Sequence, residues 1–208
     1  VKKISYEQVK LGRKPKLFIQ INIGNENQKS GIDLENFEEF YNYCIAADLN
    51  IIGTMCIPPL EKNVSDQFNK NALLLRFVAN YMKKNLIKGN IIQLSSIYGM
   101  VAQDKNIYEG TNMRENMSYA MIKGGILNLI RQMASYYGDF NIKINCISPG
   151  GVKDKQNKRF IKNYSKRVPL RRMAHVDEIA SVIAFLSMDA SSYITGSNLV
   201  VDGGWTII

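Results

Sequence analysis

The sequence has one histidine, three cysteines and no long apolar run. Because His175 stands alone and Cys44, Cys56 and Cys146 are far apart, a Cys/His zinc cluster is excluded and no metal site is expected. The thiols are expected to be buried and reduced, as in a cytoplasmic protein. No apolar run approaches the roughly 20 residues that span a bilayer, so no membrane partner is expected.

Acidic residues are also scarce in the larger part of the chain. The net charge is +9, and residues 67–208 carry 19 basic against 9 acidic side chains, whereas residues 1–66 carry 8 and 9. Such an imbalance raises the question of a nucleic-acid partner. No zinc finger, aromatic RNA-binding strand or basic helix repeat accompanies the charge, so nucleic acid is not expected as a partner.

Short β-branched runs alternate with segments of helical periodicity, which predicts an α/β protein with a parallel sheet. Asp33 is expected to cap the first of these helices. The expected strands cover residues 16–23, 50–57, 90–96, 142–148 and 198–204, and the expected helices cover 34–47, about 67–85, about 117–138 and 176–187.

The stretch "SYAMIK" places Tyr119 and Lys123 four residues apart, on one face of an expected helix. An ammonium beside a phenol favours the phenolate and lowers its pKa from about 10 towards neutrality, which suits proton transfer. Ser95 and Ser96 end one expected strand, and "PGG" from Pro149 ends another. Ligands of open parallel sheets bind at this carboxyl edge.

Four ordered motifs resemble the short-chain dehydrogenase/reductase family. They are S-x-x-G from Ser96, Y-x-x-x-K from Tyr119, N-x-x-x-P-G from Asn145 and T-G-x-x-x-x-x-D-G-G from Thr195. The resemblance covers about residues 70–208. It implies the C-terminal half of a Rossmann-like parallel sheet, with a β-α-β fragment before it. It also implies an oxidoreductase that uses NAD or NADP on a carbonyl or secondary alcohol, and a homodimer or homotetramer.

The same resemblance assigns roles to single residues. Ser96 would bind the substrate oxygen, Tyr119 would be the general acid/base, and Lys123 would hold the nicotinamide ribose and lower the phenol's pKa. Ser95 is expected to be structural. Pro149, Gly150 and Val152 would line the cofactor, with the backbone of Val152 meeting the nicotinamide carboxamide. The family's helix asparagine has no clear equivalent, because the spacing suits neither Asn69 nor Asn71.

Two segments depart from the family pattern. The stretch between Ser96 and Tyr119 is long and resembles a substrate-side insertion, as in members similar to those of surface-sugar and flagellin-glycan biosynthesis. Residues 153–172, the basic flap, hold nine basic residues and one acid. The flap could receive an anionic substrate such as an acidic sugar or a sugar nucleotide. The alternative is a solvated helix surface.

The glycine-rich turn T-G-x-x-x-G-x-G that carries the cofactor's pyrophosphate in this family is not found in the sequence. Instead, residues about 14–68 resemble the pyridoxal-phosphate homeostasis proteins, through Q-x-N-x-x-x-E-x-x-K-S-G and L-x-I-x-G-T-M-x-I-P. Lys29 is not that family's Schiff-base lysine, which lies further upstream. This segment is therefore not expected to bind pyridoxal phosphate.

Two accounts of the chain stay open. In the first, a barrel-like fragment (1–68) is joined to a dehydrogenase half-domain (69–208) in a chimera. In the second, residues 1–68 are a diverged Rossmann half. The expected function is an NAD(P)-dependent oxidoreductase whose activity is in doubt without the glycine-rich turn. The alternatives are a catalytically inactive truncated or chimeric protein and, less favoured, a pyridoxal-phosphate binder.

Overall fold

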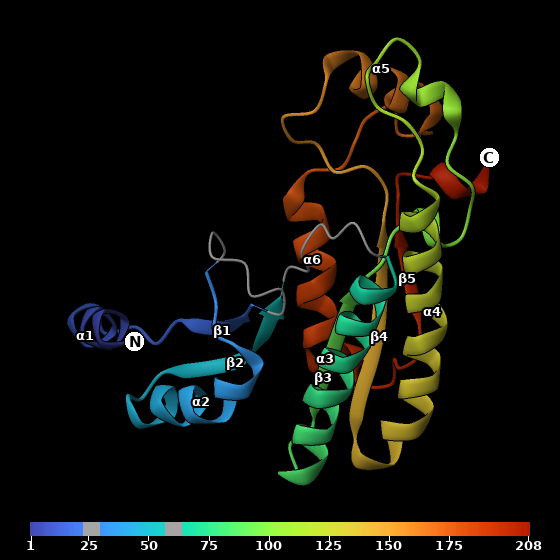
Figure 1. Cartoon of the computed structure of the whole chain (residues 1–208). Helices are drawn as coiled ribbons and strands as arrows, with labels where there is room; N and C mark the ends of the chain where they lie inside the picture. The colour runs from blue at the N-terminus through green and yellow to red at the C-terminus, as the bar shows by residue number, and fades with distance from the viewer. Residues whose placement is uncertain (23–29, 57–63) are drawn as a thin grey trace. The chain divides into compact units, whose positions relative to one another are not determined.

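The computed structural model describes residues 1–22, 30–56 and 64–208 (Figure 1). The chain forms two compact units, residues 1–74 and 75–208. Strands alternate with helices and pair in parallel sheets, which confirms the expected α/β class. The last residue of each of the strands expected at 16–23 and 50–57 lies outside the described residues. Among the helices described, none is long and apolar enough to cross a membrane.

The N-terminal unit is a parallel strand pair joined by a helix. Its elements are α1 (Lys2–Leu11), β1 (Lys16–Ile21), the 3-10 turn η1 (Leu34–Asn36), α2 (Phe37–Ala46) and β2 (Asn50–Cys56). β1 and β2 pair along their whole lengths. Ile19 and Ile21 of β1 and Phe37 and Cys44 of α2 are buried, so the unit has a small apolar core of its own.

Two features of this unit differ from the sequence expectation. Helix α1 was not expected, because it has no apolar run. It is held by polar contacts, including the buried side chain of Gln8, whose amide donates to the Asp48 carbonyl at 2.9 Å. Asp33 is the N-cap residue of the 3-10 turn that leads into α2, but its side chain makes no capping hydrogen bond, and the α-helix begins only at Phe37.

The C-terminal unit is a three-stranded parallel sheet in the order β3-β4-β5. Its regular helices and strands are the end of α3 (Val64–Lys84), β3 (Gly89–Leu94), α4 (Met117–Tyr137), β4 (Ile142–Pro149), α5 (Lys158–Arg167), α6 (Val176–Ser187) and β5 (Asn198–Val201). The 3-10 turns are η2 (Ile97–Gly99), η3 (Lys105–Tyr108), η4 (Gly138–Phe140), η5 (Asp189–Ser191) and η6 (Trp205–Ile207).

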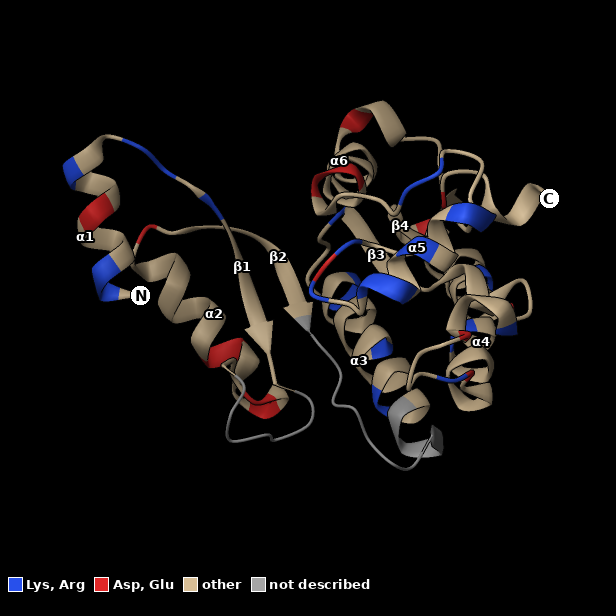
Figure 2. Ribbon diagram, turned by 90° about the horizontal axis from the view of Figure 1, so that it is seen from above, with Lys and Arg blue, Asp and Glu red and all other residues tan. Residues whose placement is uncertain are grey.

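Strand β4 forms the centre of this unit. Figures 1 and 2 show it between α4 on one side and α6 on the other. All of its residues from Ile144 to Ser148 are buried, as expected for a strand covered on both faces. The three strands run in the same direction, so their carboxyl ends meet at one edge of the sheet.

The last strand is shorter than the expected 198–204. It ends at Val201, and the next three residues turn away from the sheet. Gly203 and Gly204 have positive φ angles of 65° and 92°, which favour glycine. The Asp202 carboxylate closes the turn by accepting the Gly204 N–H at 2.8 Å.

Two of the four sequence motifs bind each other. The Asn145 side chain is 1 % exposed, donates to the Ile194 carbonyl at 2.8 Å and accepts the Ser197 N–H at 3.1 Å. The Thr195 hydroxyl accepts the Ile144 N–H at 3.1 Å. The asparagine of N-x-x-x-P-G therefore binds the loop that contains Thr195 and Gly196 to β4. Both motifs stabilise the fold.

Replacing Asn145 by alanine is expected to lower the free energy of unfolding by about 2–4 kcal/mol, because a buried carbonyl and a buried N–H lose their partner. The measurement is urea denaturation followed by the fluorescence of Trp205, the single tryptophan. Asn128→Ala removes the same amide from the exposed face of α4 and should change stability by less than about 0.5 kcal/mol. Equal effects of the two variants would contradict the structural role of Asn145.

Candidate active site

Ser96 lies at the carboxyl edge of the sheet. The strand expected at 90–96 ends at Leu94, so Ser95 and Ser96 start the segment that leaves it. The Ser96 side chain is buried, and its hydroxyl oxygen accepts the Tyr98 N–H at 3.2 Å. A serine hydroxyl that accepts through one lone pair keeps its own O–H to donate. Ser96 is thus oriented, with a donor left for a ligand oxygen.

The segment that follows Ser96 is packed tightly on α4. The Ser95 hydroxyl donates to the Lys123 carbonyl at 2.8 Å. A Cβ atom on Gly99 would lie 2.7 Å from both the carbonyl carbon and the carbonyl oxygen of Lys123. Only glycine lets the backbone of η2 come this close to the helix. The glycine of S-x-x-G therefore sets the distance between the Ser96 loop and α4.

Tyr119 and Lys123 share a face of α4, as their spacing predicts. The Lys123 ammonium lies 5.5 Å from the centroid of the Tyr119 ring and donates to the Leu94 carbonyl at 3.1 Å. Burial lowers the pKa of Lys123. The Tyr119 side chain is 40 % exposed, so its ring is accessible to a ligand. Two protons of the ammonium remain for other acceptors, because an ammonium has three.

The first turn of α4 is fixed by Asn116. Its side-chain oxygen accepts the Tyr119 N–H at 3.0 Å, as an N-cap residue does. The Gln103 side chain in turn donates to the Asn116 carbonyl at 3.0 Å and accepts the Asn116 N–H at 3.1 Å. The long segment between Ser96 and Tyr119 therefore folds back on the helix that carries Tyr119.

The same insertion packs on the basic flap through an aromatic cluster. Tyr108 stacks on Phe160 with ring centroids 5.8 Å apart, and Tyr98 meets Trp205 edge to face at 6.3 Å. The buried residues of the cluster are Ile97, Ile107, Phe160, Tyr164, Val168, Met173 and Trp205. Insertion, flap and C-terminal turn thus share one core beside the carboxyl edge of the sheet.

The P-G-G turn continues β4 along this edge. Pro149 pairs with Val201, and the Gly150 N–H donates to the Val201 carbonyl at 2.9 Å, so the turn starts as an extension of the sheet. A Cβ on Gly150 would lie 2.9 Å from the Asp202 Cα. This glycine is therefore required by close packing within the protein itself.

Val152 is held by a second backbone pairing. It forms a parallel bridge with Ala174, whose N–H donates to the Gly151 carbonyl at 2.9 Å and whose carbonyl accepts the Lys153 N–H at 2.8 Å. In a parallel bridge of this kind the amide and carbonyl of the middle residue point away from the partner. The Val152 carbonyl accepts from the Gln156 side chain at 2.7 Å.

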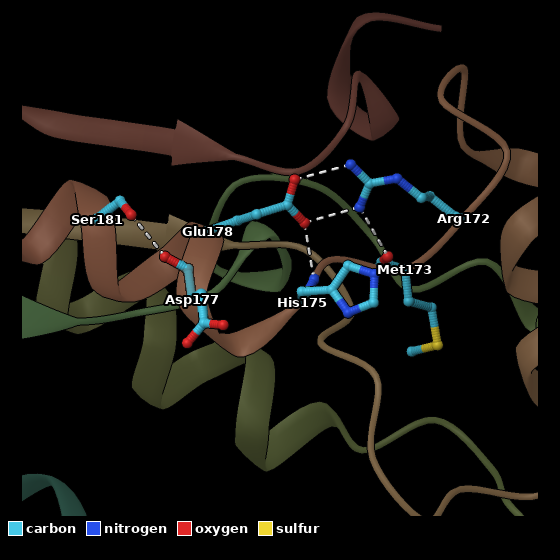
Figure 3. A network of polar contacts seen from close by, with 6 residues as sticks. All are labelled: Arg172, Met173, His175, Asp177, Glu178 and Ser181. Carbon is cyan, nitrogen blue, oxygen red and sulfur yellow. Dashed lines mark hydrogen bonds and ion pairs between the residues drawn. The ribbon is translucent and has the colours of Figure 1, made fainter.

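Ala174 is positioned by the polar network in Figure 3. The Arg172 guanidinium makes two hydrogen bonds of 2.7 Å to the Glu178 carboxylate, which also accepts the His175 N–H at 2.7 Å. Arg172 further donates to the Met173 carbonyl at 3.2 Å. The hydrogen bonds from Arg172 lower the pKa of Glu178 to about 2. The network fixes the residues on both sides of Ala174, and with them the bridge to Val152.

Two cavities lie beside these residues. The smaller, of about 100 Å³, is lined by Gly150, Gly151, Tyr164, Leu170, Arg172, Ala174, Glu178, Val201, Asp202 and Gly203. The larger, of about 310 Å³, is lined by Asp104, Asn106, Ile107, Glu109, Asn163, Lys166 and Arg167. Of the expected site residues only Gly150 lines either one. Ser96, Tyr119 and Lys123 lie outside both cavities.

The structure brings the expected residues to one edge of one unit. Ser96 follows β3, the Pro149–Val152 turn follows β4, and the helix with Tyr119 and Lys123 packs on the Ser96 loop. Sequence reasoning missed Tyr164, whose hydroxyl binds the P-G-G turn. Its signal was the spacing of four from Phe160, which marks a buried face inside a basic helix. Among the described residues no group of metal-ligating side chains occurs.

Comparison with known proteins finds a matching family model and several relatives. The family model described as "Enoyl-(Acyl carrier protein) reductase" matches residues 67–206. The post-translational flagellin modification protein A of Campylobacter coli is 37% identical over 129 residues. The match covers 62% of this chain and 50% of that protein. Glucose 1-dehydrogenase 2 of Bacillus subtilis is 32% identical over 153 residues, covering 71% and 54%. The chain thus spans about half the length of the curated relatives it matches.

A solved structure extends the likeness. A short-chain dehydrogenase from Leptospira borgpetersenii with bound NAD+ superposes with a TM-score of 0.69 at 25% identity, covering 99% of this chain and 87% of that one. The likeness includes residues 1–68. None of these three relatives is a pyridoxal-phosphate homeostasis protein, so the resemblance of residues 14–68 to that family stays a prediction.

Gly99→Ala is expected to lower the free energy of unfolding by about 1–3 kcal/mol, because its methyl group meets rigid backbone of α4. The measurement is the midpoint of urea denaturation. Gly138→Ala is the matched control, since a Cβ there meets no atom within 4 Å and its φ of −58° suits alanine. That variant should be neutral or up to about 1 kcal/mol more stable. A neutral Gly99→Ala would contradict the close contact.

Glu178 is expected to stabilise the fold in a pH-dependent way. Its pKa in the folded state, about 2, lies below the ordinary value of 4.5, so its contribution is complete above pH 4.5 and is lost as the pH falls towards 2. The melting temperature of Glu178→Gln should therefore lie below that of the original chain at neutral pH and converge with it at about pH 2. Asp177→Asn, whose carboxylate points away from Arg172 in Figure 3, is the control. A gap that persists unchanged to pH 2 would refute the ion pair.

Proposed function

Since the chain belongs to the short-chain dehydrogenase/reductase family, we propose that its C-terminal unit is built to interconvert a secondary alcohol and a carbonyl with NAD or NADP. The observation that carries the proposal is the meeting of Ser96, Tyr119, Lys123 and the P-G-G turn at one carboxyl edge. Ligands of open parallel sheets bind at this edge. The NAD+ bound to the Leptospira structure supports the choice of cofactor.

Each residue has a role that suits its geometry. The Ser96 O–H, left free by the Tyr98 contact, donates to the substrate oxygen. Tyr119 would take the proton of the alcohol in oxidation and return it in reduction. A bound nicotinamide would supply the hydride chemistry. The Lys123 ammonium would hold the ribose hydroxyls with the protons not given to Leu94.

The residues present fit the nicotinamide end of the cofactor. Pro149 and Gly150 line this end, and the Val152 amide, which points away from Ala174, is available to the carboxamide. Lys123 supplies donors for the ribose. The pyrophosphate end has no equivalent, because the sequence lacks the glycine-rich turn that brings backbone amides to phosphates. The fit therefore covers half of a dinucleotide.

The substrate is proposed to be derived from a sugar and to carry negative charge. The name of one relative, a glucose dehydrogenase, supports the sugar. Figure 2 shows Lys and Arg along α5, beside the insertion. Phe160 and Tyr164 occupy the buried face of α5, so its exposed face carries the charge. The basic residues of α5 are Lys158, Arg159, Lys162, Lys166 and Arg167.

The second candidate is a catalytically inactive protein that keeps only the family's association surfaces. The missing glycine-rich turn favours it. On α4, Met117 is 90% and Met121 65% exposed, an apolar surface that suits a homodimer or homotetramer. A pyridoxal-phosphate binder is the third and least favoured reading, because the lysine that forms the Schiff base is not in the sequence.

Titration with NADH, followed by nicotinamide fluorescence, is the first test. Saturable binding is expected under the proposal, and its absence would favour the inactive protein. Where binding is found, Tyr119→Phe should reduce turnover by at least about 10²-fold, because the proton carrier is removed. Affinity for NADH should stay within about twofold, since the ring and Lys123 remain.

Turnover is measured with glucose and glucose 6-phosphate, a neutral and an anionic probe, through the absorbance of NADH. Tyr136→Phe, an exposed tyrosine at the other end of α4, is the control and should leave turnover unchanged. Undiminished turnover in Tyr119→Phe would exclude the proton role. Preference for glucose over its phosphate would exclude the anionic substrate.

A further inference from the structure

Tyr164 lies in the middle of the basic flap and is nevertheless almost completely buried, at 2 % exposure. Its ring stacks on Trp205 with centroids 4.4 Å apart and an interplanar angle of 21°. Its hydroxyl accepts the Gly151 N–H at 2.5 Å. A side chain of the flap thus binds the backbone of the P-G-G turn directly, across thirteen residues of chain.

The turn is shaped around this phenol. A Cβ on Gly150 would lie 3.0 Å from the Tyr164 hydroxyl, and one on Gly151 would lie 2.8 Å from the ring carbon that carries it. Two consecutive glycines are therefore needed to let the ring reach the turn. Sequence reasoning attributed the open backbone of this turn to an approaching ligand. The structure shows that a side chain of the protein fills the space on this side.

The turn is held on its other side by Ala174, which binds Gly151 and Lys153. Val152 is the residue between these two. The Gly151 N–H donates to the Tyr164 hydroxyl, and the Gly151 carbonyl accepts from the Ala174 N–H. Both backbone polar groups of Gly151 are therefore held by hydrogen bonds. The direction of the Val152 amide then depends on one side-chain contact from the flap and one backbone contact from the segment before α6.

We propose that Tyr164 is a positioning residue: by holding the Gly151 N–H it sets where Val152 meets the nicotinamide and ties the basic flap to the cofactor turn. The proposal rests on the proposed function for the identity of that ligand. A shift of the flap must carry the turn with it, because a rigid, stacked ring joins the two. Occupation of the flap by substrate and placement of the nicotinamide are thereby coupled.

The phenol acts as a neutral hydroxyl. Burial raises the pKa of Tyr164 to about 12, an effect that the Gly151 hydrogen bond partly offsets. It therefore keeps its proton at physiological pH. This separates Tyr164 from Tyr119, which is exposed and faces Lys123. The two tyrosines differ in task because their surroundings differ.

Tyr164→Phe is the direct test, since it keeps the ring on Trp205 and removes only the hydroxyl. Amide hydrogen exchange measured by NMR on the full chain should accelerate at least about tenfold at Gly151, and little at Ile144 in the centre of β4. Tyr193→Phe, at a fully exposed position, is the control and should change neither rate. Unchanged exchange at Gly151 would overturn the proposal.

Cofactor probes provide the second readout. NADH affinity should fall about tenfold in Tyr164→Phe, as expected for a lost hydrogen bond, while ADP-ribose, which lacks the nicotinamide, should bind as before. Equal weakening of both probes would indicate a general structural role and overturn the proposal. A chain that binds neither probe before substitution refutes the proposed function alone, because Gly151 exchange still reports on Tyr164.

Loss of the fold in the variant would show as a changed Trp205 emission. In that case amide exchange is measured on the original chain. The proposal requires its Gly151 amide to be as protected from exchange as the Ala174 amide. Rapid exchange at Gly151 in the folded chain would overturn it.

Discussion

The candidate site depends on one close backbone contact, that of Gly99 with the peptide of Lys123. No side chain separates the two, so the Ser96 loop and α4 have one relative position. The Ser95 hydroxyl holds the same carbonyl and fixes the helix along its axis. The position of α4 beside the Ser96 loop also sets the positions of Lys123 and of Tyr119, one turn earlier. A proton relay needs this precision, because a displacement of about 1 Å can cost 10²-fold in rate.

Much of the motif pattern serves the fold before it serves a ligand. The Asn145 side chain binds the loop that contains Thr195. A Cβ atom on Gly150 would clash with Asp202, and one on Gly99 would clash with α4. Each motif contributes to a contact between segments that are far apart in the sequence. For this reason the four short motifs together identify this edge of the sheet. Residues that would touch a ligand, such as Tyr119, are the exposed minority among them.

Periodicity was sufficient to predict the alternation of strands and helices and the edge where Ser96 and Pro149 lie, because both follow from local pattern and from the rule that parallel strands end together. It could not give α1, which polar side chains such as Gln8 hold in place. Nor could it give Tyr164, whose role arises from a contact thirteen residues away. Asp33 was expected to cap a helix because its residue type favours caps, but a 3-10 turn intervenes.

The two ends of a dinucleotide make different chemical demands. The nicotinamide end needs side chains at a sheet edge, and Ser96, Tyr119 and Lys123 are the side chains proposed for it. The phosphate end needs backbone so close to the ligand that only a series of glycines permits it, and β1 leads into no such series. A parallel β-α-β unit is common to Rossmann sheets and to barrels. The solved dehydrogenase structure that superposes on 99% of this chain extends the Rossmann likeness to the N-terminal unit. Under the proposed function, affinity for the cofactor would depend on the phosphate contacts, whereas the reaction chemistry would depend on α4.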